Sequence, residues 1–206
     1  VNAINNILGN YGTTIDMNST CYTKQGDDTQ LEALISDMNA GNVGALIVLD
    51  TNPAYFLAEK FTAAVKKVAI KIDLSERNNE STPLADYCCP NHHYLEAWND
   101  AVPQDGLYAT AQPTIAPLYN TRNAIQSIMA FAGQDVDEYD FVKETCSQEI
   151  FGNQNEYGSA DLLWTNTVHN GEVSFNSPEE EAISFSMTDL SSASADVMKA
   201  SKVGGE

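Results

Sequence analysis

Apolar positions in the first part of the chain recur with two spacings, one typical of helices and one typical of strands. A short helix is predicted over residues 1–8, with Gly9 behind it, because its apolar residues lie three and four positions apart. A longer helix is predicted over residues 29–41, where Thr29 and Glu32 form a capping-box pattern. The chain therefore opens with two predicted helices.

Two apolar runs then predict strands. Residues 45–49 form the first run, and residues 68–72 form the second, which ends at Asp73. Apolar runs of this length are typical of buried strands in a parallel sheet. The turn 50–53 leads from the first strand into a helix that carries Phe61, and the crossover to the second strand is expected to be right-handed. The predicted fold class is therefore α/β, a βαβ unit with a parallel sheet.

Fewer elements are predicted in the middle of the chain. A short extended stretch covers residues 87–89, and Thr121 is positioned to cap a helix that closes at Gly133. Residues 140–147 are predicted to form another helix. All of these elements lie before Gly171.

The chain changes character after Gly171. An acidic run at residues 178–181 is followed by a Ser/Ala-rich stretch over residues 191–201, a composition typical of an arm or linker. We therefore predict an α/β domain over residues 1–171 and an acidic, then Ser/Ala-rich, less regular arm over residues 172–206.

The composition is strongly acidic. The chain carries 29 acidic and 10 basic residues, a formal net charge of −19, so a phosphate backbone or an anionic membrane surface is repelled. A basic protein such as a small cytochrome would be attracted, and a simply soluble acidic surface explains the charge equally well. No apolar run approaches the roughly 18 residues that a membrane-spanning helix needs. We therefore expect no nucleic-acid partner and no direct membrane span.

The densest group of reactive side chains is the stretch Cys-Cys-Pro-Asn-His-His at residues 88–93. Its candidate ligands for zinc or copper are Cys88, Cys89, His92 and His93. Zinc sites usually separate their ligands by several residues, whereas adjacent residues of an extended stretch point to opposite faces. A structural role is therefore favoured, and an acidic metal-binding protein is the weaker alternative.

Several signatures of catalysis are missing from the sequence, namely the G-x-S-x-G elbow, the G-x-G-x-x-G or phosphate-binding loop, and the four-cysteine iron–sulfur run. The loops at the strand ends remain, because ligands of parallel α/β sheets bind beyond the carboxyl ends of the strands. The turn 50–53 offers Asp, Thr and Asn side chains to a base or ribose, and Pro53 can start the next helix. An ordinary βα turn has the same appearance.

Four consecutive blocks of sequence carry a more specific signal: VNAINNILGNYG, LISDMNAGNVGALIVLDTNPAYF, KKVAIKIDLSERNNESTPLADYCCPNHHYLEAWNDA and GLYATAQPTIAPLYNTRNAIQSIMAFAG. Their order resembles the molybdopterin oxidoreductase family. It is more closely similar to the molybdopterin-like part of the iron–sulfur subunit of Alternative Complex III, a bacterial quinol oxidoreductase. The resemblance covers residues 1–171.

The resemblance implies a site. Catalytic members of the family hold a pterin guanine dinucleotide at an Asn-Pro turn and in an acid-containing loop after the next strand. The matching positions in this chain are Asn52, Pro53, Asp73, Thr82 and Asp86. By resemblance, these five residues are the vestige of a cofactor site.

The chain departs from catalytic relatives beside this site. Residues 88–89 are Cys-Cys where the relatives have an aliphatic pair, and residues 98–100 replace a Gly-Thr pair. Residues 93–101 match instead the HYLE-x-W-x-D-A block of the Alternative Complex III branch, which is understood to have lost the molybdenum cofactor. The implied function is a non-catalytic, cofactor-free scaffold module of a respiratory quinol oxidoreductase. A portion of a true molybdenum–pterin oxidoreductase is the alternative.

The resemblance also implies a cellular setting. Electrons would pass through iron–sulfur clusters and haems outside this segment, in iron–sulfur and cytochrome c-type partners of a membrane-bound respiratory complex. The complex would lie on the periplasmic side of the bacterial inner membrane. The parent subunit would add a twin-arginine-translocated region and a ferredoxin-like part that bears the clusters, so we expect the chain to be part of a longer protein. Its molybdopterin guanine dinucleotide is expected to be lost.

Overall fold

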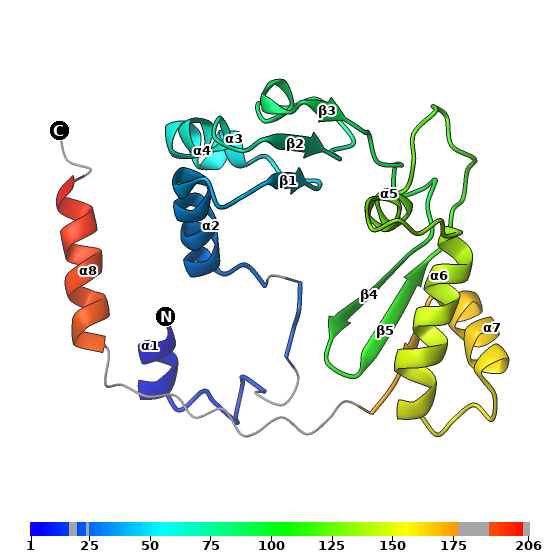
Figure 1. Cartoon of the computed structure of the whole chain (residues 1–206). Coiled ribbons are helices and arrows are strands. Elements are labelled where there is room, and N and C mark those ends of the chain that lie inside the picture. The colour runs from blue at the N-terminus through cyan, green and yellow to red at the C-terminus, as the bar shows by residue number, and fades with distance from the viewer. Residues whose placement is uncertain (17–19, 24, 177–189, 204–206) are drawn as a thin grey trace.

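The computed structural model describes residues 1–16, 20–23, 25–176 and 190–203 (Figure 1). Its helices are α1 (Asn2–Ile7), α2 (Asp28–Ala40), α3 (Pro53–Phe56), α4 (Ala58–Val65), α5 (Ala124–Phe131), α6 (Glu138–Thr145), α7 (Ala160–Asn170) and α8 (Leu190–Val203), with shorter turns η1 (Thr82–Leu84), η2 (Cys146–Ile150) and η3 (Phe151–Asn153). Its strands are β1 (Ala45–Val48), β2 (Ile70–Asp73), β3 (Tyr87–Cys88), β4 (Asn99–Gln104), β5 (Leu107–Ala111) and β6 (Glu172–Ser174).

The first sheet is parallel and contains β1, β2 and β3 in that order. Its register pairs Ile47 with Ile72, and Ile72 with Tyr87. The connection from β1 to β2 is divided into α3 and α4 at Ala58, whose φ is 46°. The predicted α/β fold with a parallel sheet is confirmed, although its crossover contains two short helices where one was expected.

Helices cover only one face of the parallel sheet. α2 and α4 pack on that face through a cluster that includes Met38, Ala64 and Val65, with Leu46 of β1 packed against it. On the other face, Ile47 and Ile70 remain 41% and 46% exposed. The expectation of fully buried strands is therefore wrong, because no described element packs over the second face.

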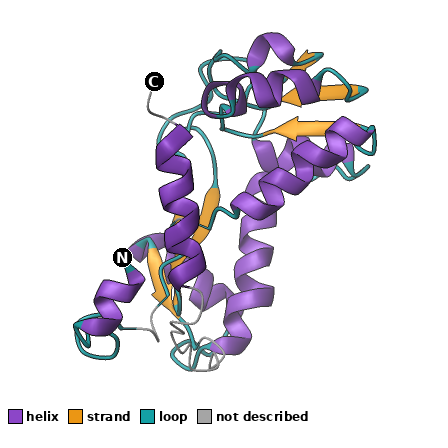
Figure 2. Cartoon of the chain, turned by 90° about the vertical axis from the view of Figure 1, so that its left-hand side faces the viewer, coloured by secondary structure: helices purple, strands orange, loops and turns teal. Residues whose placement is uncertain are grey.

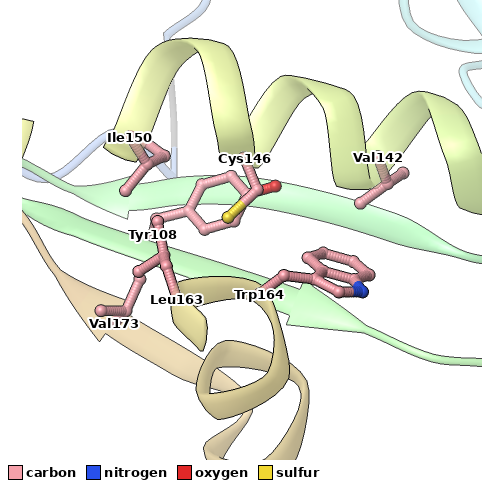
Figure 3. Close-up of a cluster of buried hydrophobic side chains, with 7 residues drawn as sticks. All are labelled: Tyr108, Val142, Cys146, Ile150, Leu163, Trp164 and Val173. Atoms are coloured by element: carbon pink, nitrogen blue, oxygen red, sulfur yellow. The ribbon is translucent and has the colours of Figure 1, made fainter. Parts of the chain in front are cut away.

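A second sheet, which the sequence patterns did not predict, lies at the other end of the molecule (Figure 2). β4, β5 and β6 pair antiparallel, and residues 105–106 form the turn between β4 and β5. β6 comes from residues 172–174, at the start of the predicted arm. The side chains of its core come from β5, β6, α6, η2 and α7 (Figure 3), and they are Tyr108, Val142, Cys146, Ile150, Leu163, Trp164 and Val173.

Two helices are capped by residues other than those predicted. The Asp27 carboxylate caps α2 by accepting from backbone N–H groups of its first turn, so the capping box of Thr29 and Glu32 is wrong. α5 is capped by the buried side chain of Asn123 rather than by Thr121. In both helices the residue at the N-cap position itself provides the accepting side chain.

The arm after β6 is described only in part. α8 covers all of the Ser/Ala-rich stretch at residues 191–201, whereas the acidic run at residues 178–181 lies outside the described residues. In the part of the chain that the structure describes, every helix is too short or too polar to cross a membrane.

Candidate functional site

The loops that follow the three parallel strands meet at Asp50. This residue has a positive φ of 44°, an unusual conformation for a side chain other than glycine. Its Oδ1 accepts a hydrogen bond from the backbone N–H of Glu76 at 3.3 Å, and its Oδ2 accepts one from the Asn91 amide at 3.1 Å. Asp50 therefore ties the loop after β1 to the loops after β2 and β3.

Asn52 is held by the loop after β2. Its Nδ2 donates to Glu80 Oε2 at 2.6 Å, and its Oδ1 accepts from the Ser81 hydroxyl at 2.9 Å. The Ser81 Oγ in turn accepts from the backbone N–H of Ala54 at 3.0 Å, in the first turn of α3. Pro53 is buried and starts α3, as predicted. The Asn52 side chain therefore pairs with other side chains and does not cap α3 itself.

Asp73 is buried at the end of β2 and has partners on both carboxylate oxygens. Its Oδ1 accepts from the backbone N–H of Ser75 at 2.9 Å, and its Oδ2 accepts from the Thr82 hydroxyl at 2.7 Å. The Thr82 oxygen also accepts from the backbone N–H of Asn79 at 3.0 Å. Asp73 and Thr82 thus fold the loop after β2 back onto its own strand.

Asp86 does not belong to this group. Its Oδ2 lies 2.8 Å from Lys71 Nζ and accepts from the Lys71 backbone N–H at 2.9 Å, beside the middle of β2. The hydrogen bond to Lys71 lowers the pKa of the Asp86 carboxyl. The structure therefore brings Asn52, Asp73 and Thr82 to the strand ends and leaves Asp86 along the sheet.

Three of the four candidate metal ligands, Cys88, His92 and His93, have separate partners. The Cys88 thiol lies 3.9 Å from the Thr82 carbonyl, and His92 Nδ1 lies 2.6 Å from Thr121 Oγ1. His93 Nδ1 accepts from the backbone N–H of Leu95 at 3.3 Å. Among the described residues, no group of three or more His, Cys, Asp or Glu side chains is arranged to hold a metal ion.

Two cavities adjoin the loop after β3. The larger has a volume of about 390 Å³ and is lined by Glu76, Arg77, Asn91, His93, Leu95, Glu96, Ile115, Leu118, Tyr119 and Thr121. The smaller has about 360 Å³ and is lined by Cys88, Cys89, Pro90, Asn120, Thr121, Arg122, Ser127 and Phe131. Both volumes fall at the lower end of small-ligand pockets. They offer space for one compact group rather than for an extended dinucleotide.

The larger cavity is electrostatically unsuited to a pyrophosphate. Glu96 is buried in its wall, where its carboxylate accepts from the backbone N–H groups of Leu118 at 2.9 Å and His93 at 3.1 Å. The bond from Leu118 has the largest effect on the pKa of Glu96, and the bond from His93 acts in the same direction. Both lower this pKa, so the carboxylate stays ionised. The lining guanidinium, Arg77, is already paired with the Glu76 carboxylate. The negatively charged pyrophosphate would therefore meet two carboxylates, Glu76 and Glu96, and one arginine that is already ion-paired.

The residues implied for the dinucleotide do not fit a bound cofactor. Each polar side-chain atom of Asn52, Asp73 and Thr82 already has a partner within the loops. Two residues do most to join the loops: Asp50, which the sequence offers only as part of the turn 50–53, and Asn91, which is not among the predicted site residues. A signal was present for both, since Asp50 directly follows a strand and Asn91 lies inside the Cys-Cys-Pro-Asn-His-His stretch.

Comparison with known proteins adds no family assignment. No protein-family model matches the chain, and no curated protein is similar enough to count as a match. The chemistry of the site is therefore argued from its own residues.

Proposed function

We propose that this chain is a non-catalytic, cofactor-free scaffold module of a respiratory quinol oxidoreductase complex. Electron transfer is carried by iron–sulfur clusters and haems outside residues 1–206, in the remainder of the parent subunit and in partner subunits on the periplasmic side of the membrane. The proposal combines the sequence resemblance of residues 1–171 with one structural observation. That observation is a closed network in which Asn52 pairs with Ser81 and Asp73 pairs with Thr82. Asn79 links the two pairs, because its side-chain oxygen accepts from the Ser81 N–H and its own N–H donates to the Thr82 hydroxyl.

A closed network of this kind supports a structural role for the strand-end loops. A site that binds a ligand by hydrogen bonds keeps donors and acceptors directed at the ligand, and these groups are costly to leave unpaired. Here the same groups join β2, the loop after it and the first turn of α3. The residues matching the ancestral cofactor site thus hold the loops of a scaffold.

The test compares stability with activity in the assembled complex. Asn52→Ala removes two side-chain hydrogen bonds, so we expect the free energy of unfolding to fall by roughly 1 kcal/mol, with unchanged quinol oxidation per folded complex. Asn78→Ala, at an exposed position of the same loop, is the matched control and should change neither quantity. Urea unfolding and quinol oxidation are measured side by side.

The competing function, a true molybdenum–pterin oxidoreductase, gives the opposite result. Loss of turnover with release of a pterin, at unchanged unfolding free energy, would mean that Asn52 still binds the cofactor. Stoichiometric molybdenum in the full subunit, measured by elemental analysis, would also overturn the scaffold proposal. Because the metal analysis uses the unaltered complex, its result does not depend on whether a variant folds.

A further inference from the structure

The open face of the parallel sheet is a continuous apolar surface. Because paired residues of neighbouring strands point to the same side, the register places Ile47, Ile72 and Tyr87 in one row and Ala45 with Ile70 in the next. Ile47, Ile70 and Tyr87 are 41%, 46% and 62% exposed. We call these five residues the open face. None of them is charged, in a chain whose net charge is −19.

An uncovered face is unusual for this kind of sheet. Parallel sheets occur almost only with helices on both faces, and contiguous exposed apolar surface marks a place of interaction. α2 and α4 already cover the opposite face. What the open face lacks is therefore an amphipathic helix with an aliphatic side.

The chain contains a helix of that description. Leu190, Ala193 and Val197 of α8 are spaced by three and four residues, so they share one side of the helix. Leu190 and Val197 are 43% and 70% exposed. A helix of 14 residues is about 21 Å long, enough to cross three strands spaced about 4.8 Å apart. The open face and the aliphatic side of α8 are thus two complementary surfaces.

We propose that the open face binds α8 of a second copy of this chain, so that two copies exchange their arms about a twofold axis. Figure 1 shows that α8 stands apart from its own parallel sheet, and that the arm begins at β6, at the other end of the molecule. A second copy can present its arm without any change of this arrangement. Exchange of identical elements is a common route to symmetric dimers.

Charge supports α8 as the element that is exchanged. Residues 190–203 contain two lysines and one aspartate, so this helix is slightly basic, whereas the whole chain has a formal net charge of −19. Contact through α8 places the least acidic of the described helices at the interface. Because the two acidic copies still repel each other, we expect added salt, which screens this repulsion, to strengthen the dimer. The proposal does not depend on the proposed function.

The first experiment measures association of the full chain by sedimentation equilibrium. We expect a monomer–dimer equilibrium that tightens between 50 mM and 500 mM NaCl. Ile70→Asp and Val197→Asp, one on each surface, should each weaken dimerisation at least tenfold while the far-ultraviolet circular dichroism stays unchanged. Leu118→Asp, at an exposed apolar position outside both surfaces, should dimerise normally. A monomer at all concentrations, or equal weakening by all three variants, overturns the proposal.

The second experiment identifies which copy supplies the helix. A chain carrying only Ile70→Cys is mixed with a chain carrying only Val197→Cys, both in a Cys21→Ser, Cys88→Ser background, and treated with a short bismaleimide. We expect a cross-link between the two different chains. If a single chain carrying both cysteines cross-links only within itself, and the mixture gives no product, α8 binds its own sheet and arm exchange is wrong.

Discussion

At the scale of single residues, the cysteines show how position sets chemistry. Cys21 is exposed, and its hydrogen bond with Thr23 lowers the pKa of its thiol. Cys88 is also exposed as a residue, but its thiol is partly shielded from water, and this shielding is the main reason that its pKa is raised. The nearby Asp73 carboxylate raises the pKa further. Cys146 lies in the core of the antiparallel sheet, where burial raises its pKa to about 11. The thiolate is the reactive form, so reactivity should follow this order.

We predict that iodoacetamide at pH 8 modifies Cys21 faster than Cys88, and that Cys146 is protected in the folded chain. Peptide mass spectrometry of samples quenched over time gives the three rates. In 8 M urea the rates should converge, because burial and the Thr23 contact are lost. Native labelling of Cys146 at the rate of Cys21 would mean that the core around Tyr108 and Val142 is open to solvent.

At the scale of elements, the sequence predicts the parallel unit much better than the rest. Apolar runs mark β1 and β2, and apolar residues at helical spacing mark the helical connection between them. β4 reads Asn-Asp-Ala-Val-Pro-Gln, which has neither strand alternation nor a favourable composition. It forms a strand because it pairs with β5 and lies against α6. These are tertiary contacts, which the local sequence does not show. The Asp105–Gly106 pair was the available local signal for this hairpin.

The same physics limits what could be predicted of the site. The strand-end position of Asn52 and Asp73 follows from the βαβ order alone. Their partners do not, because Ser81 and Thr82 are brought to them by the course of a loop without periodicity. The side chain of Asn91 joins two elements separated in sequence, which local pattern cannot indicate.

The turn of the β4–β5 hairpin should tolerate no side chain. Gly106 has a φ of +73°, and a Cβ there would lie 3.0 Å from the Phe175 carbonyl oxygen. The Gly106 carbonyl also accepts from the Phe175 N–H at 2.8 Å, so the two segments cannot easily separate. We expect Gly106→Ala to lower the free energy of unfolding by about 1–2 kcal/mol. Urea titration measures the change.

Gly152→Ala is the matched control, because its φ is not in the left-handed region and a Cβ there meets open space. It should be neutral or slightly stabilising, since alanine restricts the unfolded chain more than glycine does. Equal losses for both variants would show that the approach of Phe175 is not what constrains the hairpin.

At the scale of the whole molecule, two sheets with separate cores are joined by a few polar contacts. The parallel unit has its core between α2 and α4, and the antiparallel sheet has its core under α6 and α7. Asn91 lies between them: its amide donates to Asp50 at 3.1 Å, and its Oδ1 accepts from the Ala124 N–H at 2.8 Å, at the start of α5. The Arg122 N–H adds a longer bond to the Pro90 carbonyl at 3.4 Å.

These contacts predict that one side chain couples the strand-end loops to α5. Asn91→Ala removes both bonds, so amide hydrogen exchange should accelerate at the start of α5 and in the loop after β1. Asn91→Asp separates the two contacts, because its carboxylate still accepts from the Ala124 N–H but repels the Asp50 carboxylate. Exchange should then accelerate in the loop after β1 while Ala124 stays protected. Unchanged exchange in both regions for Asn91→Ala would mean that the two halves are held together without Asn91, by contacts such as the pairing of Tyr22 N–H with the Pro103 carbonyl at 2.9 Å.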